Sequence, residues 1–220
     1  MEFTGERYVP TEAGEIRHEH LHRYAWCARL AKGKDVLDIA CGEGYGSAML
    51  AARAKSVVGV DIDDATIEHA RGVYRGIVGL QFQRGDAAEI PLADSSIDLV
   101  VSFETIEHHD RHREMIAEIR RVLRPGGLLV LSSPNRDVYS QLSGQHNEFH
   151  VKELDFRELD TALREQFEDV IYFGQRLAVG SSIFALEKNR LDKTVDAFVD
   201  TGSEVERRAA SLLSRSWPKS

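Results

Sequence analysis

Cysteine, excess positive charge and long apolar runs are what this sequence lacks. Its two cysteines, Cys27 and Cys41, provide neither a disulfide framework nor the ligand spacing of a zinc site. Acidic side chains outnumber basic ones by 36 to 28, which gives a formal net charge of −8. That balance argues against the basic surface that binds nucleic acid or anionic lipid. We therefore expect neither a nucleic acid nor a membrane as a partner.

The lack of long apolar stretches points the same way. No run approaches the roughly 20 residues that span a bilayer, and residues 1–7 carry no apolar segment typical of a secretion signal. The 220 residues include 42% hydrophobic and 29% charged side chains, which is typical of a chain that folds around a core. We expect one cytoplasmic globular domain with a modest extension.

Short apolar runs alternate with helical patterns through the first 134 residues. Apolar runs rich in β-branched residues predict strands at 36–40, 57–60, 79–82, 97–103 and 128–131. Helical spacing of apolar residues predicts helices at 15–31, 47–54 and 65–74, and a fourth that carries the stripe from Met115 to Leu123. Strands that alternate with helices in this way predict a parallel sheet covered on both faces.

The pattern changes after Pro134. A polar loop at 135–148 precedes a predicted helix at 152–167, and two strand-like runs follow at 169–173 and 177–186. Two strands joined by a short link must pair antiparallel. The predicted fold is therefore α/β, a doubly wound, seven-stranded, mostly parallel sheet with an antiparallel C-terminal hairpin and helices on both faces.

Three segments organise the chain in this interpretation. An N-terminal arm and lid helix occupy residues 1–32, the core occupies 33–187, and a helical tail occupies 188–220. The tail has the spacing of two amphipathic helices. It is interpreted as a peripheral packing element or a partly disordered tail, with the contact of a homodimer as the alternative.

A glycine cluster follows the first predicted strand. Gly42 and Gly44 would let a ligand approach the backbone, and Asp61 ends the second strand 19 residues after Gly42, where a carboxylate can accept hydrogen bonds from ribose. A dinucleotide fingerprint needs its third glycine one position later than Gly46. Asp38 would also repel a pyrophosphate but attract an ammonium and a sulfonium. The pattern favours S-adenosylmethionine over a nicotinamide cofactor, whose oxidoreductases are the alternative.

Five segments in the right order resemble the motifs of the class I (Rossmann-like) S-adenosylmethionine-dependent methyltransferases. The likeness covers residues 33–134 and is strongest to small ubiquinone-biosynthesis-like and sugar-modifying members. Each motif alone is common, whereas the ordered set is specific. The matching segments are residues 36–44, 57–62, 85–91, 98–108 and 120–127.

The resemblance implies a set of cofactor-binding residues, which are Asp38, Ala40, Gly42, Gly44, Asp61, Ile62, Asp86, Ala87 and Phe103. In this family's pattern, Asp38 would lie near the amino-acid end of the cofactor and Asp61 would hold the ribose. Ile62 would pack on the adenine, Asp86 would accept from the adenine amino group, and Phe103 would offer its backbone to the methionine moiety. The structural alternatives are a helix N-cap for Asp61 and a turn residue for Asp86.

Histidines predicted near the C-terminal ends of the strands are the candidate catalytic residues. Transfer to a hydroxyl or a protonated amine requires a base whose pKa lies near neutral pH. We favour His146 or His150 as that base, Glu148 as its orienting carboxylate or a substrate ligand, and His108 as the alternative base. The same group could hold a divalent ion with Glu104 or Asp110. Because nothing determines the ligand spacing, no metal is predicted.

The sequence therefore predicts an S-adenosylmethionine-dependent methyltransferase that produces S-adenosylhomocysteine. Its expected acceptor is a small polar molecule, most simply a sugar or nucleotide-linked sugar of polysaccharide or natural-product biosynthesis, methylated on oxygen or nitrogen. Another natural product, a quinone-like acceptor, or a non-catalytic cofactor-binding subunit are the alternatives. Four residues of the arm and lid helix are candidates to bind the cofactor's carboxylate, namely Arg7, Arg17, Arg23 and Tyr24.

Overall fold

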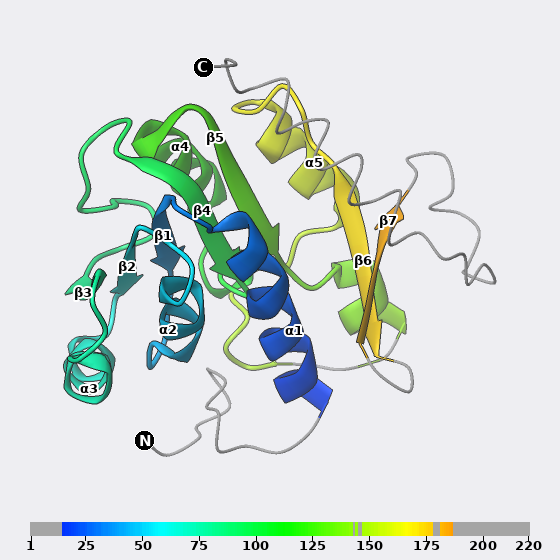
Figure 1. Cartoon of the computed structure of the whole chain (residues 1–220). Helices are drawn as coiled ribbons and strands as arrows, with labels where there is room; N and C mark the ends of the chain where they lie inside the picture. Colours follow the sequence, from blue (N-terminus) through cyan, green and yellow to red (C-terminus); the bar gives the residue numbers. More distant parts are fainter. Residues whose placement is uncertain (1–14, 143, 145–146, 178–180, 187–220) are drawn as a thin grey trace. The chain divides into compact units, whose positions relative to one another are not determined.

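The computed structural model describes residues 15–142, 144, 147–177 and 181–186 (Figure 1). Two compact units make up the chain, Met1–Glu168 and Asp169–Ser220. The helices are α1 (Glu15–Leu30), α2 (Tyr45–Ala51), α3 (Asp64–Tyr74), α4 (His112–Val122), α5 (Phe156–Arg164) and the short turns η1 (Ile106–His108) and η2 (Asp137–Leu142). The strands are β1 (Asp35–Ile39), β2 (Ser56–Asp61), β3 (Leu80–Arg84), β4 (Ile97–Phe103), β5 (Leu123–Ser132), β6 (Tyr172–Leu177) and β7 (Ser181–Leu186).

The first unit is built on a five-stranded sheet in the order β3-β2-β1-β4-β5. All neighbouring strands pair in parallel, so the predicted doubly wound α/β architecture is confirmed for these five strands. The order reverses between β1 and β4. In open α/β sheets, ligands bind beyond the carboxyl ends of the strands at this reversal point. The loops that follow β1, β2 and β4 are therefore where a site is expected.

Buried apolar side chains fill both faces of the central strands. Every residue of β4 except Asp98 is buried, as expected for a parallel strand covered by helices on both sides. Leu99 and Val101 pack in one cluster with Tyr24 and Cys27 of α1 and Leu50 of α2. Figure 1 shows α1 and α2 in front of the sheet and α4 behind it. The lid helix of the sequence prediction thus contributes buried residues to the core.

The second unit holds a two-stranded antiparallel sheet formed by β6 and β7. Tyr172 pairs with Leu186 at one end, and Leu177 pairs with Ser181 at the other. The structure records this pair and the five parallel strands as two sheets, so the predicted single seven-stranded sheet is not confirmed. The predicted tail at 188–220 and the arm at 1–14 lie outside the described residues.

Two predicted elements after the fifth strand differ from the structure. The predicted loop at 135–148 contains the π-helical turn η2, which begins where the backbone N–H of Tyr139 donates to the carbonyl of Asn135 over 2.8 Å. The predicted helix at 152–167 starts only at Phe156. Its N-terminus is set by a capping box in which Asp155 and Glu158 each accept from the other's backbone N–H. Among the described helices, none has the length and hydropathy needed to cross a membrane.

Candidate active site

The loop between β1 and α2 has an unusual backbone conformation, with three residues at positive φ. Ala40, Gly42 and Gly44 all adopt left-handed conformations, with φ of 56°, 54° and 90°. An alanine in this region is strained by roughly 1–2 kcal/mol, and such residues gather at functional sites. A side chain at Gly42 would meet nothing within 4 Å, so the space beside its backbone is open. The loop therefore presents main-chain groups at the end of β1, as a site for a ligand requires.

Asp61 ties this loop to the end of the neighbouring strand β2. Its carboxylate accepts from the backbone N–H of Gly42 over 2.9 Å and from the backbone N–H of Asp63 over 3.1 Å. The residue that caps α3 is Asp63, whose side chain accepts from the N–H of Ala65. The alternative structural role of Asp61, a helix N-cap, is thus wrong. Its side chain instead fixes the loop that follows β1, one of the two strands between which the order of the sheet reverses.

Residues after β2 and β3 continue the same edge of the sheet. Ile62, directly after Asp61, is 60% exposed, so its apolar side chain is accessible to a ligand. Asp86 follows β3, accepts from the N–H of Ala88 over 2.8 Å and lies 3.3 Å from an Arg111 guanidinium nitrogen. Asp86 thus forms a turn, as its structural alternative proposed, and it still leaves 42% of its side chain exposed. Ala87, which lies between Asp86 and Ala88 in the chain, is partly buried.

Asp38 differs from the other two aspartates because no part of it is exposed. Its two carboxylate oxygens accept from the hydroxyls of Tyr24, over 3.1 Å, and Ser47, over 2.6 Å. Burial raises the pKa of Asp38 to about 7, although these two hydrogen bonds oppose the shift. Asp38 therefore joins α1, β1 and α2 beneath the loop.

A second carboxylate connects β4 to the N-terminal helix. Glu104, directly after Phe103, has a φ of 49° and accepts from Arg23 over 2.8 Å and from the hydroxyl of Ser132 over 2.5 Å. The Arg23 guanidinium also lies 5.7 Å from the centre of the Phe103 ring. Of the four candidates for a cofactor carboxylate, Arg23 and Tyr24 thus already contact carboxylates of the protein. Arg7 and the Arg17 side chain lie outside the described part of the chain.

The chain is similar to known proteins. A family model described as "Methyltransferase domain" matches residues 37–131. A Mycolicibacterium smegmatis protein named "Probable S-adenosylmethionine-dependent methyltransferase" is 40% identical over 168 residues, which are 74% of this chain and 63% of that protein. Residues 37–131 thus match a methyltransferase domain, and the chain is similar to S-adenosylmethionine-dependent methyltransferases. It spans less than two thirds of the length of that relative.

Two further comparisons agree with this likeness. A Mycobacterium tuberculosis protein named "Phthiotriol/phenolphthiotriol dimycocerosates methyltransferase" is 34% identical over 137 residues, which are 59% of this chain and 50% of that protein. The crystal structure of the YcgJ protein of Bacillus subtilis has a TM-score of 0.62 at 22% identity, over 71% of this chain and 70% of that one. The structural likeness shows the methyltransferase fold.

The described residues fit S-adenosylmethionine, the cofactor of this methyltransferase family. Three groups lie along one edge of the sheet. They are the open left-handed loop at Gly42, the Asp61 carboxylate at the end of β2, and the exposed side chain of Ile62 beside it. These groups suit a backbone contact, a ribose diol and an adenine face respectively. Together they supply the donors, acceptors and apolar surface that this cofactor's parts require.

The predicted catalytic residues lie after β4 and before α5. The His108 and His150 rings meet edge to face, with centroids 5.2 Å apart. His146 lies outside the described residues, and Glu148 is exposed. A carboxylate that contacts His150 is Glu153, over 2.6 Å, whereas the roles expected of Glu148 stay predictions. A spacing of three residues was a signal available in the sequence for Glu153.

Sequence reasoning also missed Glu107 as a member of this group. Glu107 has no exposed surface, and its two carboxylate oxygens have no hydrogen-bond partner among the described residues. Burial raises the pKa of Glu107 well above its usual range, and the Glu104 carboxylate adds to the shift. The signal in the sequence was a charged residue a few positions after the apolar strand, next to His108.

Proposed function

We propose that this chain is a methyltransferase that uses S-adenosylmethionine to methylate an oxygen or nitrogen of a small acceptor. One observation carries the proposal, namely that Asp61, at the end of β2, forms a 2.9 Å hydrogen bond to the open Gly42 loop, and this loop lies at the reversal point of the sheet. When bound, the cofactor supplies an electrophilic methyl group on a sulfonium. The protein's part is to hold the cofactor, align the acceptor and assist removal of the acceptor's proton.

The cofactor roles follow the edge of the sheet. Asp61 would accept from the ribose hydroxyls, Ile62 would pack on the adenine, and Asp86 with the neighbouring Ala87 would bind the adenine amino group. The backbone of Ala40, Gly42, Gly44 and Phe103 would surround the methionine moiety. Because both oxygens of Asp38 already accept from protein hydroxyls, we propose that Asp38 acts on the amino-acid end by holding the loop in place.

The proposed acceptor is a sugar or a nucleotide-linked sugar. Support comes from polar side chains before α5, where Ser140 donates to Glu153 and Asn147 contacts His150. His108 and His150 are the described histidines proposed to assist removal of the acceptor's proton, with His146 as a third candidate. The name of the phthiotriol relative favours a second candidate, a lipid alcohol. Cytoplasmic location and a homodimer stay predictions.

Calorimetric titration of S-adenosylmethionine tests the cofactor site. Removing the carboxylate in Asp61→Ala should weaken binding about 100-fold, because two hydrogen bonds from ribose to a charged group contribute about 3 kcal/mol together. Asp64→Ala is the matched control, since Asp64 is an exposed aspartate three residues away whose ion pair with Arg84 is on the surface. The control should bind like the wild type.

Equal affinity of the wild type and Asp61→Ala would refute this site. Thermal stabilisation by NAD, without stabilisation by S-adenosylhomocysteine, would instead favour the oxidoreductase alternative. The acceptor is tested by transfer of a labelled methyl group to two panels, nucleotide sugars and lipid alcohols. Label only in the lipid panel would overturn the sugar proposal, and cofactor binding without label in any panel would favour a non-catalytic subunit.

A further inference from the structure

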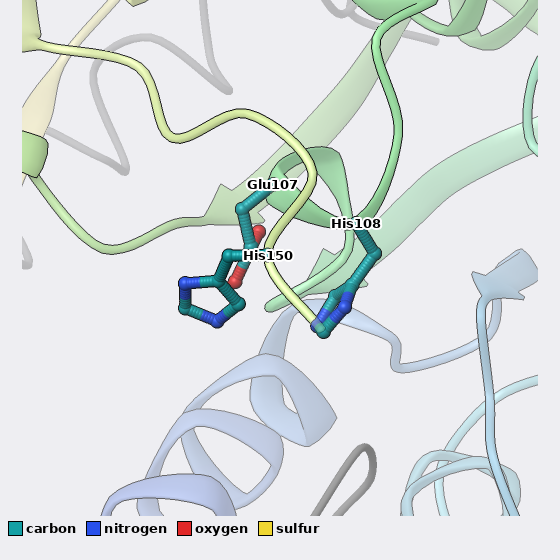
Figure 2. A group of neighbouring side chains, drawn as sticks. All are labelled: Glu107, His108 and His150. Carbon is teal, nitrogen blue, oxygen red and sulfur yellow. The ribbon is translucent and has the colours of Figure 1, made fainter. Parts of the chain in front are cut away.

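Glu107, His108 and His150 bring three ligand atoms together from two separate parts of the chain. One carboxylate oxygen and one nitrogen from each imidazole all lie within 4.8 Å of one another. Figure 2 shows the side chains converging, two from the turn after β4 and one from the loop before α5. A metal ion with ligand bonds of about 2.1 Å separates its ligand atoms by roughly 3–4 Å. Small side-chain rotations would therefore close the group around an ion.

The hydrogen bonds of both histidines determine which nitrogen carries the lone pair. Nδ1 of His108 lies 3.0 Å from the carbonyl oxygen of Phe149, so this nitrogen holds the proton and donates. Nδ1 of His150 lies 2.6 Å from the Glu153 carboxylate and donates in the same way. Nε2 is then the unprotonated nitrogen of each ring. Metal-binding histidines are oriented by this kind of contact, from the other ring nitrogen to a carboxylate or a carbonyl.

The side chain of Asn147 supports the same assignment for His150. Its carbonyl oxygen accepts from the backbone N–H of Phe149 over 3.0 Å, which turns its amide nitrogen toward Nε2 of His150 at 3.1 Å. An amide nitrogen can only donate, so Nε2 of His150 must accept. An ion would take the position that this amide donor holds.

Glu107 is the strongest evidence for a ligand. A fully buried carboxylate with neither oxygen hydrogen-bonded is costly unless a proton or a cation neutralises it. Its backbone is held firmly, since its carbonyl accepts from the N–H groups of Val151, over 2.9 Å, and Lys152, over 3.1 Å. These two bonds tie the loop that carries His150 to the turn that carries Glu107. The three donors are therefore held together before any ion binds.

The charges around the group also favour a cation. Glu104 and Glu153 are neighbouring carboxylates. Burial raises the pKa of the Tyr139 hydroxyl, and these two carboxylates and Glu107 raise it further. The nearby positive charge is Arg23, which is paired with Glu104. The Glu107 carboxylate has no hydrogen-bond partner among the described residues.

We propose that Glu107, His108 and His150 bind one divalent transition-metal ion. Two imidazoles and one carboxylate suit Zn²⁺, Fe²⁺, Mn²⁺ or Co²⁺, and three protein ligands leave coordination positions open to water or to an acceptor oxygen. This departs from the sequence prediction of no metal, which could not see that His150 lies next to Glu107.

The role of the ion in catalysis rests on the proposed function, whereas metal binding itself does not. An acceptor hydroxyl at an open position would lose its proton to water more readily. Its oxygen lone pair would form the new O–CH₃ bond, and the electron pair of the broken S–CH₃ bond would stay on sulfur as the thioether. In this arrangement His108 and His150 position the acceptor through the ion and do not take its proton.

Cobalt(II) titration of the untagged, metal-free full chain tests the proposal, because the visible spectrum of cobalt reports nitrogen and oxygen ligation directly. We expect one equivalent of cobalt in the wild type and loss of that spectrum in Glu107→Gln and His150→Ala. Glu153→Gln should bind 10–100-fold more weakly, as is usual when a carboxylate that orients a ligand is removed. His69→Ala is the control, since His69 is a partly exposed histidine whose nearest carboxylate, on Glu43, is 3.8 Å away.

Absence of stoichiometric cobalt binding, or an unchanged spectrum in Glu107→Gln, would overturn the metal site. Far-ultraviolet circular dichroism shows whether each variant folds, and Glu107→Gln keeps the size of the side chain should His150→Ala fail to fold. Titration of S-adenosylmethionine into the same preparations separates the two proposals. Cofactor binding without cobalt binding would refute the metal site alone, and the reverse would refute the cofactor site alone.

Discussion

Gly46, in the first turn of α2, should be intolerant of even one added methyl group. A Cβ at Gly46 would come to 2.5 Å or less from three ring carbons of Tyr24. The ring has little freedom to retreat, because it is 4% exposed and lies edge-on to Tyr45 at 5.4 Å and to Phe103 at 5.0 Å. Its hydroxyl also donates to Asp38 over 3.1 Å. Gly46→Ala must therefore displace Tyr24.

The expected loss of stability combines three contributions. Overpacking of a filled core costs about 1–3 kcal/mol, and loss of the hydrogen bond from Tyr24 to a carboxylate costs about 1.5–3 kcal/mol. Alanine is better than glycine in a helix by about 1 kcal/mol, which offsets part of this. The free energy of unfolding of Gly46→Ala should fall by about 2–4 kcal/mol. For a chain of this size, the melting temperature should fall by roughly 5–15 °C.

Urea unfolding followed by circular dichroism measures this change, with Gly72→Ala as the matched control. Gly72 is an exposed glycine of α3, and a Cβ there would meet nothing within 4 Å. Gly72→Ala should therefore raise the free energy of unfolding by about 0.5–1 kcal/mol. In a Tyr24→Leu background, the penalty of Gly46→Ala should shrink because the opposing ring carbons are gone. If Gly46→Ala stabilised the chain as Gly72→Ala does, the packing argument would be wrong.

Two further predictions concern charge. The pKa of Asp38 rises from 3.8 to about 7 through burial, so the folded state holds this proton more tightly than the unfolded state, and the contribution to stability is lost as pH rises from about 4 to 7. Urea titrations across that range should show the free energy of unfolding of the wild type falling by up to about 4 kcal/mol relative to that of Asp38→Asn. If the difference between the two proteins did not change with pH, the shift in the pKa of Asp38 would be contradicted. The Arg121 guanidinium contacts Glu118, Asp94 and two backbone carbonyls at 2.7–2.8 Å. Arg121→Lys should therefore lower the free energy of unfolding by about 2 kcal/mol in urea titrations. The control is Arg113→Lys, whose side chain is 71% exposed and which should change this free energy by less than about 0.5 kcal/mol. Equal effects of the two substitutions would refute the structural role of Arg121.

The parallel strands could be predicted because their signal is local. The strand predicted at 97–103 has the bounds of β4, since an apolar run buried on both faces stands out among its charged neighbours. The start of α5 was predicted four residues too early because helical spacing continued through Lys152, while the capping box at Asp155 sets the true beginning. Which sheet a strand joins depends on tertiary packing. The assignment of β6 and β7 to the parallel sheet therefore had no local support.

In the candidate site too, residues placed by local structure could be predicted from the sequence, whereas contacts between distant segments could not. Asp61 could be found because its distance from Gly42 along the chain reflects one βαβ unit, a local and regular structure. Glu107 and His150 are brought together by backbone hydrogen bonds from Val151 and Lys152 to Glu107, across more than forty residues of chain. No periodicity or spacing in the sequence encodes that contact. The contact between Glu153 and His150 was not predicted for a related reason, because the direction of a loop side chain depends on its surroundings.

Burial assigns different tasks to carboxylates that look equivalent in the sequence. Asp38 is fully buried with both oxygens bonded to hydroxyls, so any effect on a ligand must pass through the loop it holds. Asp61 is 6% exposed and bonds only backbone N–H groups, which leaves lone pairs for a ligand's hydroxyls. Glu107 is as buried as Asp38, but its carboxylate has no hydrogen-bond partner among the described residues, which leaves both oxygens available to the proposed cation. The hydrogen bonds that a buried carboxylate makes, more than its depth, therefore separate a structural group from a ligand-binding one.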